Sequence, residues 1–390
     1  MEAKSPTTTQ DAPDRMHDPP TANSGKTVPA VQAMKGIEHV SPDRWTSAAS
    51  TPKIRITKLS HMRYRQPASN MDNLVTFLLD FGMEIVKRTE NAIWFGGYGI
   101  DQYIYYCEIG QEKEFLGGTW EVKTFEDLER AAKLGNSNIV ELKDAPGGGR
   151  YSLIRNEDNQ INFANKSSGQ GKLVTIHDPE GFPVNFIHGA TPRARPIKQP
   201  TEALQVNDEF SKPRKGAFQR FQPGPAAIHK LGHFGLTIHD FELQFRWYTT
   251  NFNLVPSDML YVPDTDGNKV DVAAFLHVDK GKAYSDHHSF FFSVAKDKHV
   301  HHSSYEVHDY DSQNMGHYWL KEKGYNPVWG LGRHKLGSQI FDYWWDPNGF
   351  MVEHYIDGDL VNEDTPTGRQ LAGDESLAVW SEPVPSTFLD

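Results

Sequence analysis

The amino-acid sequence repeats itself, and this repeat limits the possible folds more than any other feature. Residues 178–185 read DPEGFPVN, and residues 346–353 read DPNGFMVE. Two shorter pairs of segments lie upstream in the same order: KLSH (58–61) with KLGH (230–233), and GGTWEV (117–122) with HSSYEV (302–307). Three matching segments in one order indicate a duplication, so we expect two domains that are copies of one architecture.

The two copies differ at positions whose side chains could bind a metal ion. Alignment of the repeats places one triplet against another: His61, Gly117 and Asn185 against His233, His302 and Glu353. The second copy holds two histidines and a carboxylate, whereas the first has lost two of the three. A duplicated scaffold with one surviving metal site would leave this pattern.

The composition narrows the classes of protein. A chain of 390 residues is long enough for two or more domains, and no apolar run approaches the roughly 20 residues of a membrane-spanning helix. The net charge of −11 and the lack of a block rich in lysine and arginine argue against nucleic acid as a partner. The single cysteine, Cys107, rules out an intrachain disulfide and a multi-cysteine metal site, and it fits a reducing compartment.

The first 50 residues are rich in Thr, Ser, Pro, Ala and Asp and show no sustained apolar periodicity. We expect them to be a disordered tail. They lack the apolar core of a secretory signal, and their acidic residues argue against an organelle transit peptide. The expected location is therefore the cytoplasm.

From residue 54 onward, the order strand, helix, strands occurs four times, which predicts an α+β fold. Helices are predicted at 70–82, 124–134, 240–252 and 311–324. We divide the chain into five parts: a disordered tail (1–50), an N-terminal domain without a metal site (51–192), a linker (193–228), a C-terminal metal-binding domain (229–358) and an acidic tail (359–390). The last of these could fold back over the site or support a subunit contact.

Two helix boundaries follow from local sequence. Gly82 ends the first predicted helix, in which four apolar residues share one face: Leu74, Phe77, Leu78 and Phe81. Thr124 is the expected N-cap of the second helix, with Asp127 three residues further on.

His233, His302 and Glu353 each lie on a different predicted strand, so they could meet on one concave surface. Because strand side chains alternate, only one of His301 and His302 can face the site. Two imidazoles and one carboxylate on one side of an ion form the facial triad of non-haem Fe(II). The chain has 18 histidines, so a single histidine on a strand is weak evidence. The metal-ligand interpretation is stronger because all three residues lie at equivalent positions of the internal repeat.

Residues 332–353, GRHKLGSQIFDYWWDPNGFMVE, closely resemble the signature of type I extradiol ring-cleavage dioxygenases of the vicinal oxygen chelate superfamily. That signature has Gly-x-His, an aromatic segment with Tyr, Asp-Pro-x-Gly and a final Glu. The chain departs from it at Asp342, where the family usually has an apolar residue. The segments around His233 and His302 resemble the other two ligand motifs. The resemblance spans about residues 54–358 and is specific in the second half.

The resemblance implies two domains, each built of paired βαβββ modules, with the metal in the C-terminal one. The implied iron ligands are His233, His302 and Glu353. The segment DHHSFFF resembles a His-His-Ser motif whose second histidine is the acid–base residue, which indicates His288 before His287. With a pKa near neutral, His288 could relay the catechol proton. His334 and Tyr343 would line the site and hydrogen-bond the substrate, although core packing explains Tyr343 equally well.

The activity implied by the resemblance is extradiol cleavage of a small-molecule catechol by O₂. The expected cofactor is Fe(II), with Mn(II) as the alternative, and the product is of the 2-hydroxymuconic semialdehyde type. Such enzymes are commonly homo-oligomers. Other readings stay open: a glyoxalase-like enzyme, a 4-hydroxyphenylpyruvate dioxygenase, or a non-catalytic protein that binds aromatics. The sequence does not identify the catechol or the position of cleavage.

Overall fold

The structure is a computed structural model, and it describes residues 38–40, 52–142, 144–147, 151–155, 161–165, 171–193 and 205–389. Most of the expected N-terminal tail and part of the expected linker lie outside these residues. Within them, no helix is both long enough and apolar enough to cross a membrane. Mixed sheets with few helices make up the fold, as the α+β prediction requires.

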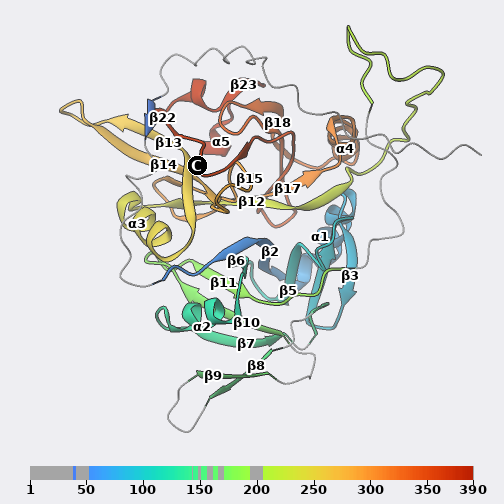
Figure 1. Ribbon diagram of the computed structural model, residues 1–390. Coiled ribbons are helices and arrows are strands. Elements are labelled where there is room, and N and C mark those ends of the chain that lie inside the picture. The colour runs from blue at the N-terminus through green and yellow to red at the C-terminus, as the bar shows by residue number, and fades with distance from the viewer. Residues whose placement is uncertain are drawn as a thin grey trace, which may run out of the picture. The chain divides into compact units, whose positions relative to one another are not determined.

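The first half of the chain forms an eight-stranded sheet with the order β3-β4-β5-β2-β6-β11-β10-β7 (Figure 1). Its strands are β2 (Ile56–Pro67), β3 (Glu84–Arg88), β4 (Ala92–Gly96), β5 (Tyr105–Gly110), β6 (Glu114–Val122), β7 (Asn138–Leu142), β10 (Gly171–His177) and β11 (Pro183–Ile187). Two helices, α1 (Met71–Asp80) and α2 (Phe125–Lys133), accompany it, and η2 (Ala68–Asn70) is a short 3-10 turn. β8 (Tyr151–Arg155) and β9 (Ile161–Asn165) form a separate antiparallel pair.

The second half, together with β1 from near the N-terminus, forms an eleven-stranded sheet with the order β1-β22-β13-β14-β16-β12-β17-β20-β19-β18-β23. Its strands are β1 (Glu38–Val40), β12 (Ile228–Ile238), β13 (Leu254–Pro263), β14 (Lys269–Val278), β16 (Phe290–Val294), β17 (His299–Val307), β18 (Pro327–His334), β19 (Ile340–Trp345), β20 (Met351–Ile356), β22 (Thr367–Leu371) and β23 (Ala378–Trp380). The helices are α3 (Phe241–Asn251), α4 (Tyr310–Glu322), α5 (Ser386–Leu389) and the 3-10 turn η3 (Asp374–Ser376). β15 (Ser285–Asp286) pairs with β21 (Leu360–Val361).

The local predictions for the first two helices are confirmed. The four predicted apolar residues after Met71 are fully buried, and Gly82 follows α1 with a φ of 105°. Few other residues adopt this conformation, so the helix ends there. At α2, Thr124 Oγ1 accepts from the N–H of Asp127 at 3.2 Å, and the Asp127 carboxylate accepts from the N–H of Thr124 at 3.2 Å. This reciprocal pair is a capping box.

The strand registers of the two halves match at the repeated segments. In the first sheet, Thr119 lies opposite His61 on one side and Asn185 on the other. In the second sheet, Ser304 lies opposite His233 and Glu353 in the same way. The central pairings also have the same directions, antiparallel between the first two strands and parallel to the third. The alignment made from sequence is therefore the alignment of the two folded halves.

Each repeated DPxGF segment forms the same turn. One carboxylate oxygen of Asp178, and likewise one of Asp346, accepts from the backbone N–H groups two and four residues later, at 2.8 to 3.0 Å. Gly181 and Gly349 occupy the same place in the two turns, with φ values of 90° and 79°. The Asp and the Gly of this segment thus serve the turn in both halves.

Both segments that flank the two halves contain strands, although residues 1–50 were predicted to be disordered. Glu38–Val40, inside the expected disordered tail, forms β1 and pairs with β22. The part beyond residue 358 contains β21, β22, η3, β23 and α5, of which β22 and β23 extend the second sheet. A three-residue strand such as β1 has too little pattern of its own to be predicted, because the free edge of a neighbouring strand provides its hydrogen bonds.

Candidate metal centre

His233, His302 and Glu353 lie on β12, β17 and β20, which are three neighbouring strands of the second sheet. All three are buried, and one ligand atom from each lies within 4.8 Å of the others. His233 Nε2 is 3.1 Å from Glu353 Oε2, and His302 Nε2 is 3.5 Å from the same oxygen. The structure thus brings the three predicted ligands together.

The polar atoms of this cluster indicate that a cation fits among them. Within the described residues, His302 Nε2 is buried without a hydrogen-bond partner, and neither carboxylate oxygen of Glu353 accepts a well-formed hydrogen bond, although His233 Nε2 lies 3.1 Å from one of them. Buried polar atoms without partners are rare because their desolvation is not compensated. Two imidazole nitrogens and a carboxylate are also the donor set of a facial triad. The residues therefore fit a divalent transition-metal ion.

The charge states at the cluster suit a metal. Burial raises the pKa of Glu353, but the adjacent His233, His334 and Ser304 together outweigh it, and the net pKa is lowered. The carboxylate is therefore ionised at neutral pH. Burial, together with the neighbouring His301, lowers the pKa of His302 well below its ordinary value. A neutral imidazole is the form that binds metals.

A cavity of about 390 Å³ opens onto the cluster. Five of the six predicted site residues line it: His233, His288, His302, His334 and Tyr343. The remaining one, Glu353, is fully buried beside His233. Much of the wall is apolar, and no lysine or arginine occurs among the described residues that line it. A cavity of this size and polarity suits a small aromatic molecule.

His334 and Tyr343 form a hydrogen-bonded pair at the cavity wall. His334 Nδ1 lies 2.8 Å from the carbonyl oxygen of Leu377, and its Nε2 lies 2.8 Å from the Tyr343 hydroxyl. A carbonyl only accepts, so Nδ1 donates and Nε2 of the neutral ring accepts from the tyrosine. Tyr343 also packs in an apolar cluster with Trp329 and Phe341. Tyr343 thus packs in the core and also lines the site.

His288 faces the cavity, whereas His287 supports it from behind. The ring centroids of His288 and His233 are 4.2 Å apart. His287 does not line the cavity; its Nε2 lies 2.7 Å from Asp258 Oδ2 and its Nδ1 lies 3.0 Å from His288 Nδ1. The expectation of a near-neutral pKa for His288 was wrong. Burial and the adjacent His233 lower this pKa well below its ordinary value, so the imidazole is a neutral proton acceptor.

Asp342, where the sequence departs from the family signature, points away from the cavity. It is fully buried, its Oδ1 lies 2.9 Å from His317 Nδ1 on α4, and its Oδ2 accepts from Trp344 Nε1 at 2.7 Å. Because neighbouring strand residues face opposite sides, Tyr343 still reaches the cavity. The departure therefore changes the packing of α4 on the sheet and leaves the site intact.

In the first half, the positions equivalent to the ligands serve the fold. Asn185 donates from Nδ2 to the carbonyl of Leu116 at 2.7 Å and accepts from Thr175 Oγ1 at 2.6 Å. Gly117 has a φ of 97°, and a Cβ atom built there would lie 2.2 Å from the carbonyl oxygen of Pro183. His61 is buried against Tyr103, with ring centroids 4.4 Å apart. None of these three contributes to a metal cluster in the described residues.

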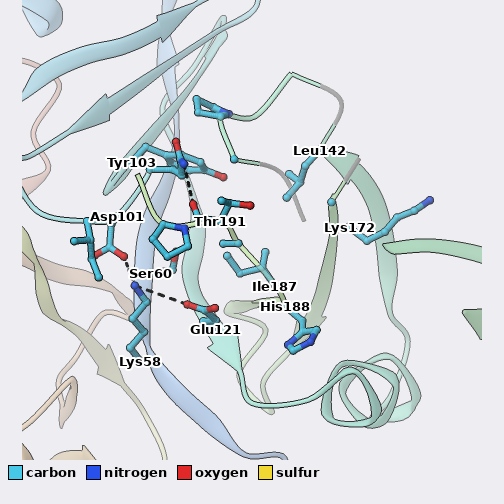
Figure 2. A pocket seen from close by; sticks show the side chains of 17 residues that line it. Lys58, Ser60, Asp101, Tyr103, Glu121, Leu142, Lys172, Ile187, His188 and Thr191 are labelled. Carbon is cyan, nitrogen blue, oxygen red and sulfur yellow. Dashed lines mark hydrogen bonds and ion pairs between the residues drawn. The ribbon is translucent and has the colours of Figure 1, made fainter. Parts of the chain in front are cut away.

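A second, smaller cavity in the first half has a different character. It measures about 90 Å³ and is lined by residues that include Lys58, Asp101, Glu121 and His188. Figure 2 shows Lys58 between the two carboxylates, with which it forms ion pairs. The lysine charge is thereby neutralised within the wall. This volume holds a few water molecules and no aromatic ring.

Sequence reasoning missed several groups around the site. Asp258 lies 29 residues from His287 in sequence and belongs to another strand, so no local motif marks it. Leu377 contributes a backbone carbonyl, and Phe388 contributes both a carbonyl and a ring. The part beyond residue 358 was considered as a possible cover of the site, and the structure places Leu377 and Phe388 in the cavity wall.

Comparison with known proteins agrees with this geometry. No family model matches the chain. The chain is 30% identical over 223 residues to metapyrocatechase 2 of Cupriavidus necator, which is 57% of this chain and 64% of that relative. The match therefore spans slightly less than two thirds of the relative's length.

Solved structures show the same fold. The chain superposes on homoprotocatechuate 2,3-dioxygenase of Arthrobacter globiformis with a TM-score of 0.64 and 18% identity, covering 87% of this chain and 93% of that one. The Mn(II)-bound glyoxalase of Novosphingobium aromaticivorans gives a TM-score of 0.62 and 18% identity, covering 85% and 94%. LapB, a 2,3-dioxygenase of Pseudomonas sp. KL28, gives 0.60 and 14%, covering 81% and 97%.

The chain therefore has the tandem-domain fold of the vicinal oxygen chelate proteins, as predicted. Its sequence similarity to metapyrocatechase 2 agrees with the resemblance found in its motifs. The fold alone does not separate a dioxygenase from a glyoxalase, because both occur among these solved structures.

Proposed function

We propose that the chain is an extradiol catechol dioxygenase that uses O₂ to cleave an aromatic ring beside its two hydroxyl groups, giving a product of the 2-hydroxymuconic semialdehyde type. One observation carries this proposal: the cluster of His233, His302 and Glu353 lies at a cavity that His288, His334 and Tyr343 also line. The similarity to metapyrocatechase 2 supports it. A cytoplasmic location, a homo-oligomeric state and the lack of a nucleic-acid partner stay predictions from sequence.

The metal assigned to the cluster is Fe(II), with His233, His302 and Glu353 as its ligands and Mn(II) as the alternative. Two neutral imidazoles and one carboxylate are the donors that non-haem Fe(II) prefers in oxygenases. When bound, the ion would supply Lewis acidity, a template for the substrate oxygens and a path for electrons to O₂.

The side chains of the cavity would handle the protons and the substrate. His288 is neutral, so it can accept the proton that a catechol hydroxyl releases. The Tyr343 hydroxyl oxygen can accept from a catechol hydroxyl while it donates to His334, and this bond of 2.8 Å to His334 fixes its orientation. The apolar wall excludes water from the ring.

The lining also indicates a substrate class. None of the described residues around the cavity is a lysine or arginine. A carboxylate on the substrate would therefore lose its hydration on binding and gain no cationic side chain in return, which costs free energy. We infer that the substrate is a monocyclic catechol whose substituent is uncharged and apolar.

The test is an aerobic assay of protein reconstituted with Fe(II) under anaerobic conditions. With 4-ethylcatechol we expect O₂ uptake, a yellow ring-opened product and both atoms of ¹⁸O₂ in that product. The isomeric diol ethylhydroquinone, whose hydroxyls are not adjacent, should give none of these. A glyoxalase is tested in parallel with the methylglyoxal–glutathione adduct. Iron-loaded protein that cleaves no catechol would refute the proposal.

A further inference from the structure

The metal-ligand candidate His302 lies at the end of a hydrogen-bonded chain that begins on α5. His301 and His302 are neighbours on β17, and their Nδ1 atoms are 2.7 Å apart. His301 Nε2 lies 2.8 Å from the backbone carbonyl oxygen of Phe388. Both histidines are buried, and both line the cavity, although strand alternation alone predicts that only one of them faces it. Three groups from two elements are thus joined in a row.

The chemistry of these atoms fixes the position of every proton in the row. A carbonyl oxygen can only accept, so His301 Nε2 carries a hydrogen. A neutral imidazole has one N–H group, which leaves His301 Nδ1 as an acceptor. His302 must then donate from Nδ1, and its Nε2 keeps the lone pair. That Nε2 is the atom 3.5 Å from Glu353 Oε2, within the candidate metal cluster.

We propose that the Phe388 carbonyl, acting through His301, holds His302 in the tautomer and orientation that bind the metal. Phe388 and His301 are therefore positioning residues, and residues 386–389 complete the metal centre without touching it. The proposal rests on the proposed function, because it takes His302 as a metal ligand. Outer partners of this kind raise the affinity of metal sites by restricting their ligands.

The packing of Phe388 supports this role. Its ring lies 5.0 Å from the His301 ring, 4.9 Å from Tyr343 and 4.8 Å from Trp329, between ring centroids. The side chain is buried and also lines the cavity. The ring thus seats α5 in one place, and the carbonyl is held at the distance His301 needs.

The test measures metal affinity in the absence of substrate and O₂, by competition of the metal-free protein with a chelating dye for Co(II). His301→Leu and deletion of residues 386–390 should each weaken binding roughly 10- to 100-fold, as loss of an outer partner does. His301→Asn should restore affinity close to that of the wild type, because its amide oxygen can accept from His302 Nδ1.

A second readout addresses the tautomer directly and does not depend on the deletion variant. In metal-free protein labelled with ¹⁵N-histidine, the NMR signals of His302 should show a protonated Nδ1 and an unprotonated Nε2. His301→Leu that binds Co(II) like the wild type, His301→Asn as weak as His301→Leu, or the opposite tautomer of His302 would each overturn the proposal. A wild type that binds no Co(II) and no Fe(II) would overturn the proposed function, and this inference with it.

Discussion

Asp346 in the second half of the chain accepts a hydrogen bond of 3.2 Å from Nε2 of Gln66 in the first half. The equivalent residue, Asp178, is held in return by the second half, since Gln244 and Tyr248 of α3 each donate to its Oδ2 at 3.0 Å. Each repeated turn therefore has a partner in the other half. The duplication produced two copies of a turn, and the folded chain uses both to join its halves.

This reciprocal arrangement predicts a large effect of Asp178→Ala on stability. The change removes the turn acceptor and leaves the buried Gln244 and Tyr248 without a partner, so the free energy of unfolding should fall by about 2–4 kcal/mol. Asp264 is a matched control, because it accepts from the N–H groups two and four residues later in an exposed turn. Asp264→Ala should cost about 0.5–1 kcal/mol in urea unfolding. Equal losses in the two variants would contradict the prediction.

Metal binding should stabilise the wild type and not the Glu353→Gln variant. A ligand present at 100 times its Kd raises the free energy of unfolding by about 2.7 kcal/mol. We expect thermal unfolding with and without Fe(II), under argon, to show this rise in the wild type and to lose it in Glu353→Gln. Asn185→Gln, at the equivalent position of the first half, should keep the full metal effect. An unchanged metal effect in Glu353→Gln would remove this residue from the ligand set.

His288→Phe should keep metal and substrate binding but lower the rate of ring cleavage. General acid–base groups contribute roughly 10²- to 10⁴-fold, and we expect a loss in that range in single turnover. His177, an exposed histidine outside the cavity, provides the control variant His177→Phe. If His288→Phe turns over at the wild-type rate, another group must accept the proton.

Catechols with an anionic substituent should be poor substrates. 4-Ethylcatechol and 3,4-dihydroxyphenylacetate are similar in size and differ in charge, so we expect kcat/KM to favour the former by roughly 100-fold, given the cost of an unpaired carboxylate in an apolar wall. Ala372→Lys, at the cavity wall, should narrow this ratio. A wild type that cleaves both equally well would refute the inferred substrate class and leave the ring-cleavage activity standing.

The pair of half-buried His317 and buried Asp342 should make stability fall as pH rises. The hydrogen bond to Asp342 raises the pKa of His317 from its ordinary value of 6.5. A raised folded-state pKa gives stability that is fully present below pH 6.5 and is lost as pH rises through the raised value. Burial raises the pKa of Asp342, which acts in the same direction.

The measurement for this pair is the free energy of unfolding of the wild type and of a double variant, His317→Leu with Asp342→Leu. Between about pH 5.5 and about pH 8.5, the wild type should lose stability relative to the double variant. Parallel pH curves would show that the pair does not titrate in this range. Because both polar partners are removed together, the double variant avoids the cost of leaving one of them buried alone.

The alternation of side chains along strands made both the fold and the metal-ligand cluster predictable from sequence. His233, His302 and Glu353 lie in short motifs on strands, where the period of two fixes the face of each side chain. Comparison with the first copy then showed which residues the fold itself does not require. This reasoning works because the register of the two halves is shared, with Thr119 and Ser304 at equivalent points.

Other parts of the site had no signal in the sequence. The groups that hold His301 and His334 are the backbone carbonyls of Phe388 and Leu377. Every residue has such a carbonyl, so only the path of the chain reveals which ones are used. Asp258 also had no signal in the sequence. Its contact with His287 depends on the pairing of β13 and β14 and not on its neighbours in sequence. The low pKa of His288 likewise follows from burial, which no motif encodes.

The backbone at Gly117 explains why the first half cannot hold the same metal site as the second. This residue stands where the second half has His302, and a Cβ atom there would lie 2.2 Å from the carbonyl of Pro183 and 2.6 Å from the Asn185 side chain. Its φ of 97° is also strained for any residue with a side chain. Substituting histidine and glutamate at the two lost positions would not recreate a metal centre. A metal site in the first half would also need a different backbone path in the strands that carry Gly117 and Pro183.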